Sequence, residues 1–127
     1  MKRGLLLFAH GARDARWAEP FEAVAARARQ HQPAWAVQLA FLEFMSPTLL
    51  AAGHALAAAL CERVDVVPLF LGAGGHVRKD LPLLVDELRA AHPGVRWKLQ
   101  LAIGEQGSVI DAMAHAAVFN LSDDPLP

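Results

Sequence analysis

The chain has 127 residues, the length of one domain, and we expect a single domain over residues 1–119 followed by a tail over residues 120–127. A hydrophobic fraction of 54% with 20% charged residues excludes a disordered chain, and a net charge of −1 without a basic stripe argues against nucleic-acid binding. The single cysteine, Cys61, cannot form an intrachain disulfide, and no run reaches the ~20 apolar residues of a membrane helix. These features are typical of a cytoplasmic protein that binds no membrane.

Apolar, β-rich runs alternate with helical patterns along the chain. In chain order, the predicted elements are strand 4–9, helix 19–30, strand 36–44, helix 48–63, strand 64–71, helix 81–91, strand 95–103 and a helix from 108 to about 119. Ser46 is the expected N-cap of the second helix, with Pro47 at its first position, and Asp80 is the expected N-cap of the third. The fourth strand alternates apolar and polar residues, which indicates an edge strand with one solvated face.

The order βαβαβαβα predicts parallel strands joined by right-handed crossovers. We therefore expect an α/β fold, a three-layer sandwich with a four-stranded parallel sheet. In such open sheets, ligands bind beyond the carboxyl ends of the strands, where the strand order reverses. If the strand order is 2-1-3-4, the first and third strands are neighbours and their carboxyl ends mark that point.

Three side chains of the metal-binding type follow the first three predicted strands. His10 follows the first, Glu43 lies near the end of the second, and His76 lies in the glycine-rich loop after the third. A lone histidine after a strand is more often a loop or capping residue than a ligand. Together, however, two imidazoles and a carboxylate suit a transition metal and leave coordination positions open.

The loop before His76 and the charges around it indicate a large, acidic ligand. Gly72, Gly74 and Gly75 permit backbone conformations that side chains would block, which would let a large flat ligand lie against the loop. Basic residues flank both histidines and would attract carboxylates, unless they are only solvated surface charges: Arg13, Arg16, Arg78 and Lys79.

Three segments carry a resemblance to a known family: "LLLFAHGARD", "LAFLEFMSPTL" and "VVPLFLGAGGHVRKDLP". On these segments the chain resembles the short CbiX/SirB-type sirohydrochlorin chelatases, which are class II tetrapyrrole chelatases. The likeness runs from Leu5 to about Ile110, and it departs at Ala12, where the family often has serine. The resemblance implies a chelatase-like α/β domain and, for short members such as this one, a homodimer.

The resemblance also implies a reaction and roles for particular residues. His10 and His76 would be the catalytic residues that bind the metal and accept protons, assisted by the Glu43 carboxylate. The residues expected to contact sirohydrochlorin are Arg13, Gly74, Gly75, Arg78 and Lys79. The reaction inserts a divalent metal as substrate, with Co²⁺ the first choice and Fe²⁺ or Ni²⁺ next, in cobalamin or sirohaem biosynthesis. No ATP or other nucleotide is expected, because the chain has no GxxxxGK[ST] motif.

Other functions fit parts of the same pattern. A non-catalytic metal or tetrapyrrole carrier could use the same histidines without turnover. The segment "FAHGARD" superficially resembles the RHG motif of histidine phosphatases, but that motif needs an arginine immediately before the histidine, and Ala9 stands there. A degenerate chelatase-like domain kept for a partner interface is a further alternative, against which the intact His10, Glu43 and His76 argue.

Overall fold

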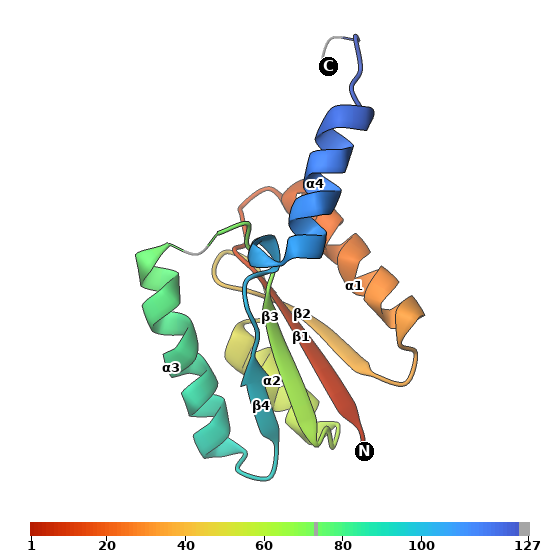
Figure 1. Ribbon diagram of the computed structural model, residues 1–127. Helices are drawn as coiled ribbons and strands as arrows, with labels where there is room; N and C mark the ends of the chain where they lie inside the picture. Colours follow the sequence, from red (N-terminus) through yellow and green to blue (C-terminus); the bar gives the residue numbers. More distant parts are fainter. Residues whose placement is uncertain (73, 125–127) are drawn as a thin grey trace.

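The computed structural model describes residues 1–72 and 74–124, with the exception of the side chain of His76. The elements follow one another as strand and helix in alternation, with two short 3-10 helices, η1 and η2 (Figure 1). Their bounds are β1 Arg3–Ala9, η1 Ala15–Ala18, α1 Glu19–His31, β2 Ala36–Phe41, α2 Leu49–Ala58, β3 Arg63–Pro68, α3 Gly75–Ala91, β4 Arg96–Leu99, η2 Ile103–Glu105 and α4 Gly107–Phe119.

The sheet has the strand order β2-β1-β3-β4, and every neighbouring pair is parallel. The expected α/β class and four-stranded parallel sheet are therefore confirmed, and the strand order is the one under which the first and third strands are neighbours. β4 lies at the edge, and its burial alternates as predicted, since Trp97 is buried while Arg96 and Lys98 are exposed. The carboxyl ends of β1 and β3 are adjacent, because Phe8 pairs with Pro68 in the register of these strands.

Apolar side chains on the two faces of the sheet make separate cores. On one face, Leu6 and Phe8 pack with residues of α2 and α3, and on the other Leu7 packs with Ala25 of α1. This alternation follows from the period of two in a strand. The sheet is thus covered by α2 and α3 on one side and α1 on the other, the three layers that were expected (Figure 1).

Two helices begin at other residues than the sequence indicated. α2 is capped by Thr48, whose Oγ1 accepts a hydrogen bond from the Ala51 N–H at 3.2 Å, so the expected Ser46 cap is wrong. Pro47 lies before the cap, and its carbonyl accepts the Phe41 N–H at 2.9 Å. Because of this bond, the chain at Pro47 lies alongside the end of β2, and α2 begins only after it.

α3 begins at Gly75, six residues before its predicted start, and Gly74 rather than Asp80 is its N-cap. Asp80 and Pro82 lie inside the helix. The helical spacing of Val77, Leu81 and Val85, all packed in or against the core, explains the early start. His76 therefore lies in the first turn of a helix and not in a loop.

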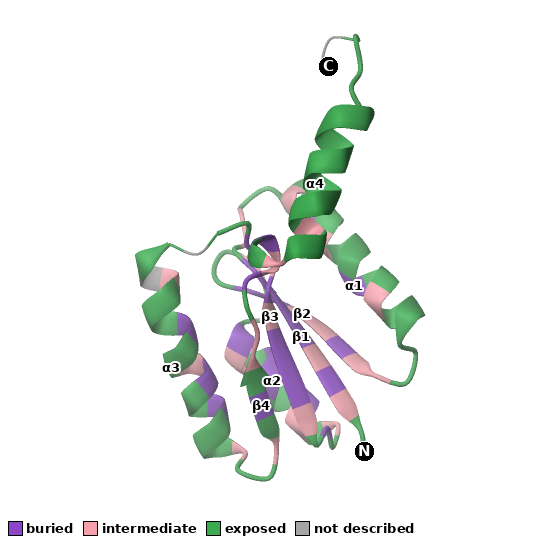
Figure 2. Ribbon diagram, viewed as in Figure 1, coloured by how far each residue is buried: buried purple, intermediate pink, exposed green. Residues whose placement is uncertain are grey.

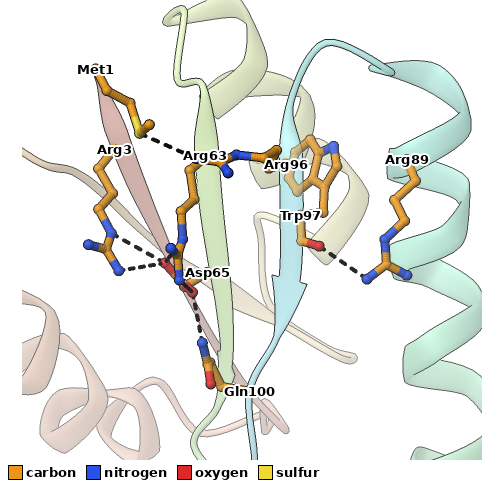
Figure 3. Close-up of polar contacts among 8 residues, drawn as sticks. All are labelled: Met1, Arg3, Arg63, Asp65, Arg89, Arg96, Trp97 and Gln100. Carbon is orange, nitrogen blue, oxygen red and sulfur yellow. Dashed lines mark hydrogen bonds and ion pairs between the residues drawn. The ribbon is translucent and has the colours of Figure 1, made fainter.

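A buried carboxylate lies on the face of the sheet that α1 covers. Asp65 of β3 is 5% exposed and accepts hydrogen bonds from Arg3, Arg63 and Gln100 (Figure 3). Burial by itself would raise the pKa of Asp65, but the hydrogen bonds from Arg63, Gln100 and Arg3 together outweigh it and hold the pKa below its ordinary value. The network joins β1, β3 and the segment after β4.

The last helix, α4, differs from the others. None of its residues is buried, and it extends away from the sheet beyond the carboxyl edge (Figures 1 and 2). Within the described part of the chain, no helix is long and apolar enough to cross a membrane.

Candidate functional site

His10 directly follows β1 and is exposed at the carboxyl edge of the sheet. Its ring lies on the ring of Phe70, with centroids 4.2 Å apart and an angle of 32° between the planes. Phe70 is 2% exposed, so it is a fixed wall for the imidazole. The contact with Phe70 covers one face of the imidazole and fixes its orientation. The exposed part of the ring remains available to a ligand.

Glu43 is held beside His10 by a hydrogen bond between their backbones. The Glu43 N–H donates to the His10 carbonyl at 3.0 Å, and the Leu42 N–H donates to the Ala9 carbonyl at 2.9 Å, so the chain after β2 continues alongside the end of β1. The Glu43 side chain is exposed. Two of the three predicted ligands are thus brought to one place at the sheet edge.

Gly11 makes this approach feasible, although it was not among the predicted site residues. Its φ of +88° is a conformation that residues with a Cβ rarely adopt, and a Cβ there would collide with the Glu43 carbonyl oxygen. The glycine in the sequence "HGAR" was the available signal. Phe70 was also missed, because its contact with His10 depends on the way two strand ends meet.

His76 is the second residue of α3, and this helix starts at the same edge of the sheet. Its side chain lies outside the described residues, so the full set of His10, Glu43 and His76 stays a prediction. Among the residues that are described, no group of three or more histidine, cysteine, aspartate or glutamate side chains is close enough to hold a metal ion.

The described glycines before His76 do not take a left-handed backbone conformation that would require glycine. Gly74 has an ordinary extended conformation, with φ −68° and ψ 165°, so its backbone does not itself require glycine. A Cβ on Gly72, Gly74 or Gly75 would meet no described atom outside its immediate chain neighbours within 4 Å. The space in front of the start of α3 is therefore open among the described residues, and the contact of Gly74 and Gly75 with a ligand stays a prediction.

The basic residues differ in how firmly the protein holds them. Arg16 pairs with Asp14 at 3.2 Å, which accounts for it locally, and Arg78 approaches Glu105 at 3.7 Å. The guanidinium of Arg13 lies 5.0 Å from the centre of the Phe44 ring. Lys79 is exposed on the first turns of α3. Arg13, Arg78 and Lys79 are therefore near the edge, and none of them is buried.

A cleft of about 360 Å³ opens between α3, the end of β4 and η2. Its lining includes Phe70, Val77, Arg78, Leu101 and Glu105. Phe70 both lines this cleft and stacks on His10, so the cleft adjoins the imidazole. The edge thus combines an exposed histidine, a carboxylate, an open glycine turn and an adjoining apolar cleft with one ion pair at its rim.

Comparison with known proteins fits this arrangement. The family model CbiX matches residues 4–118, nearly the whole described chain. The chain belongs to the CbiX family. The structure of the CbiX protein from Marinobacter aquaeolei VT8 superposes with a TM-score of 0.80 at 34% identity, covering 93% of this chain and 96% of that one. The family resemblance noted in the sequence is therefore confirmed.

Relatives in this family carry names that state an activity. A sirohydrochlorin cobaltochelatase of Sulfurisphaera tokodaii is 30% identical over 101 residues, 80% of this chain and 79% of the relative. A sirohydrochlorin ferrochelatase of Bacillus subtilis is 26% identical over 115 residues, 91% of this chain but 44% of the relative. The sirohydrochlorin chelatase SirB from Bacillus subtilis subspecies spizizenii, solved in complex with cobalt, matches with a TM-score of 0.80 at 25% identity. This chain covers 50% of SirB, so it spans about half the length of its Bacillus relatives.

Proposed function

We propose that this protein is a sirohydrochlorin chelatase that inserts a divalent metal ion into the macrocycle without ATP. The observation that carries the proposal is the placement of His10, an exposed imidazole at the end of β1. Phe70 orients its ring, and the Glu43 backbone is hydrogen-bonded to the His10 backbone. This is the edge at which ligands bind in open parallel sheets. Relatives named as sirohydrochlorin chelatases share the family and the fold.

The reaction needs a metal holder and a proton acceptor on the same face of the macrocycle. The metal takes the place of two pyrrole N–H protons, so each turnover binds one M²⁺ and releases two H⁺. In the proposed mechanism, His10 and His76 present the metal and accept the protons as bases. Glu43 orients a histidine or completes the metal shell, as carboxylates near metal-bound imidazoles do.

The proposed seat of the tetrapyrrole is the open space before α3. The absence of a Cβ on Gly74 and Gly75 lets a flat ring approach the first turn of that helix. Arg13, Arg78 and Lys79 would pair with the carboxylates on the rim of the macrocycle. Arg78 would have to exchange its 3.7 Å contact with Glu105 for a substrate carboxylate.

Cobalt is the metal we propose first, with ferrous iron and nickel next. Imidazole and carboxylate ligands accept all three, and their affinities rise gradually along the series. The relatives include a cobaltochelatase and a ferrochelatase, which supports a divalent transition metal in either the cobalamin or the sirohaem pathway. We further propose a cytoplasmic homodimer, in which a second copy supplies what the longer Bacillus relatives have in one chain.

The test is anaerobic absorbance spectroscopy of sirohydrochlorin with the protein and Co²⁺, Fe²⁺ or Ni²⁺ in turn. We expect catalytic loss of the metal-free spectrum, and we expect His10→Ala or His76→Ala to slow it by about 100-fold or more. His31→Ala is the matched control, because His31 is exposed at the far end of α1 and should leave the rate unchanged. Binding of metal or macrocycle without multiple turnovers would instead identify a carrier.

A further inference from the structure

Phe44, the residue after Glu43, has a strained backbone. Its φ is +65°, a conformation that bulky residues rarely adopt. The Met45 N–H donates to the Glu43 carbonyl at 2.8 Å, so a hydrogen bond between residues two apart closes a γ-turn around Phe44. A γ-turn with a positive φ at its central residue is the rare and strained kind. The chain therefore has phenylalanine at a position where glycine would fit with less strain.

Among the described residues, one other non-glycine residue has a positive φ, and its position explains the conformation. Leu60, with φ 66°, follows the C-cap residue of α2. The Cys61 N–H donates to the Leu56 carbonyl at 3.2 Å, so the left-handed residue ends the helix and satisfies one of its last carbonyls. Phe44 lies between β2 and α2, where no helix ends. The strain at Phe44 therefore calls for another explanation.

The phenyl ring of Phe44 contributes little to the core. It is 59% exposed, whereas the next side chain, Met45, packs against the buried cluster that contains Phe41. A single exposed apolar side chain is ordinary in itself. An exposed ring on a strained backbone is not, because neither feature stabilises the fold. Strain of this kind is typical of positions that bind a ligand.

Phe44 also lies at the candidate site. The Glu43 N–H donates to the His10 carbonyl at 3.0 Å, and the Phe44 Cα is one residue, about 3.8 Å, further along the chain. The guanidinium carbon of Arg13 lies 5.0 Å from the centre of the phenyl ring, within the range of about 6 Å for a cation–π contact. The ring thus adjoins both a proposed metal ligand and a residue proposed to bind the carboxylates of the substrate.

We propose that Phe44 binds the substrate, with the flat face of the tetrapyrrole against its phenyl ring and the same ring holding the Arg13 guanidinium toward a carboxylate on the rim. The inference rests on the proposed function and adds to it a residue that contacts the macrocycle and not the metal. A planar conjugated macrocycle and a phenyl ring attract each other by dispersion and by offset stacking. Because the γ-turn fixes where the ring leaves the chain, little side-chain freedom is lost when the substrate binds.

A role for the backbone of the turn alone predicts a different result. If the turn had only to place Glu43 and the residues before α2, glycine at position 44 would do so with less strain. Phe44→Gly would then leave substrate binding unchanged. If the ring binds the macrocycle, the same variant keeps the turn and loses the binding. This substitution therefore separates the two roles.

The experiment is a fluorescence titration of metal-free sirohydrochlorin with the full chain and its variants, with urea denaturation of the same samples. We expect Phe44→Gly to weaken binding by about 10-fold or more and to leave the urea midpoint unchanged or higher. Phe44→Leu, which keeps an apolar side chain without the aromatic ring, should bind at least about threefold more weakly than the wild type. Phe44→Tyr keeps the ring and should bind within about twofold of the wild type.

Leu60→Gly is the matched control. It relieves a φ of nearly the same value at a residue that is 78% exposed at the end of α2, away from the carboxyl edge of the sheet. It should raise the urea midpoint by about 0.5 M and leave the binding of sirohydrochlorin unchanged. A loss of binding in this control as large as that in Phe44→Gly would overturn the inference.

A double-mutant cycle tests whether the ring holds Arg13. Arg13→Gln should weaken binding by about fivefold in the wild type and by less than about twofold in Phe44→Gly, where the guanidinium has lost its support. Equal effects in both backgrounds would overturn this part of the proposal.

A chelatase assay on the same samples distinguishes the inference from the proposed function. Metal insertion by a protein in which Phe44→Gly and Phe44→Leu bind sirohydrochlorin as tightly as the wild type would overturn the inference and leave the proposed function. Binding that depends on Phe44 without metal insertion would support the inference and overturn the proposed function. A wild type that binds no sirohydrochlorin would overturn both.

Discussion

Asp65 shows how one side chain can join several elements of the sheet. Its carboxylate receives Arg3 from β1 at 3.2 Å, Arg63 from its own strand at 3.1 Å and Gln100 from beyond β4 at 2.8 Å (Figure 3). Removing one partner of a buried pair leaves the other charges uncompensated, which costs more than the pair itself contributes. Here both arginines are partly exposed, so water moderates that cost.

We expect Asp65→Asn to lower the free energy of unfolding at pH 7 by about 2–3 kcal/mol, measured by urea denaturation. Because the pKa of Asp65 is lowered in the folded protein, its contribution is complete above the unfolded pKa of about 3.9 and is lost as the pH falls through the folded value. The difference between wild type and variant should therefore shrink below about pH 4. Asp86→Asn, which removes the exposed pair with Arg89, is the control and should cost less than about 1 kcal/mol. A difference that stays constant down to pH 2 would contradict this account.

At the scale of elements, the packing of α2 on α3 depends on a glycine. Gly53 is buried within α2, and a Cβ there would lie 2.5 Å and 2.7 Å from the two terminal methyl carbons of Leu88. Leu88 is fully buried on α3, so its side chain has little room to move. Two effects of Gly53→Ala then compete: alanine gains about 1 kcal/mol in a helix, and overpacking costs about 1–3 kcal/mol.

We expect overpacking to prevail, so that Gly53→Ala lowers the free energy of unfolding by about 1 kcal/mol. In the Leu88→Ala background, which itself costs about 2–5 kcal/mol, the clash is absent and the same substitution should stabilise by about 1 kcal/mol. Urea denaturation of the four proteins in this double-mutant cycle measures the change of sign. If Gly53→Ala has the same effect in both backgrounds, the contact with Leu88 is not what requires glycine.

The elements also show which features can be predicted from the sequence. Apolar runs and their alternation predicted the strands, and strand ends pointed to His10 and Glu43 because ligands bind beyond the carboxyl ends of parallel strands. The start of α2 was missed because its cap is decided by a hydrogen bond, that of Thr48, and not by residue type alone. The start of α3 was missed because its N-cap, Gly74, makes no side-chain hydrogen bond, so that no capping residue marks it in the sequence. The stack of Phe70 on His10 joins two distant segments, so no local pattern could predict it.

At the scale of the whole molecule, the last helix takes no part in the cores on the two faces of the sheet. Both faces of the sheet are covered by helices that precede residue 92, and α4 adds no buried residue to either core. That residues 1–119 form one domain stays a prediction. Because α4 buries no residue, we expect the part of the chain that unfolds cooperatively to end at about η2. Most of the free energy of folding should then come from residues before Gly107.

We therefore expect a chain that ends at Gln106 to fold, because it keeps both cores, the Asp65 network and the Gly104 contact with Phe70. It should unfold in one cooperative urea transition, within about 1 kcal/mol of the full chain measured where the full chain is monomeric. An unfolded shortened chain, or a broad transition, would show that α4 stabilises the protomer itself.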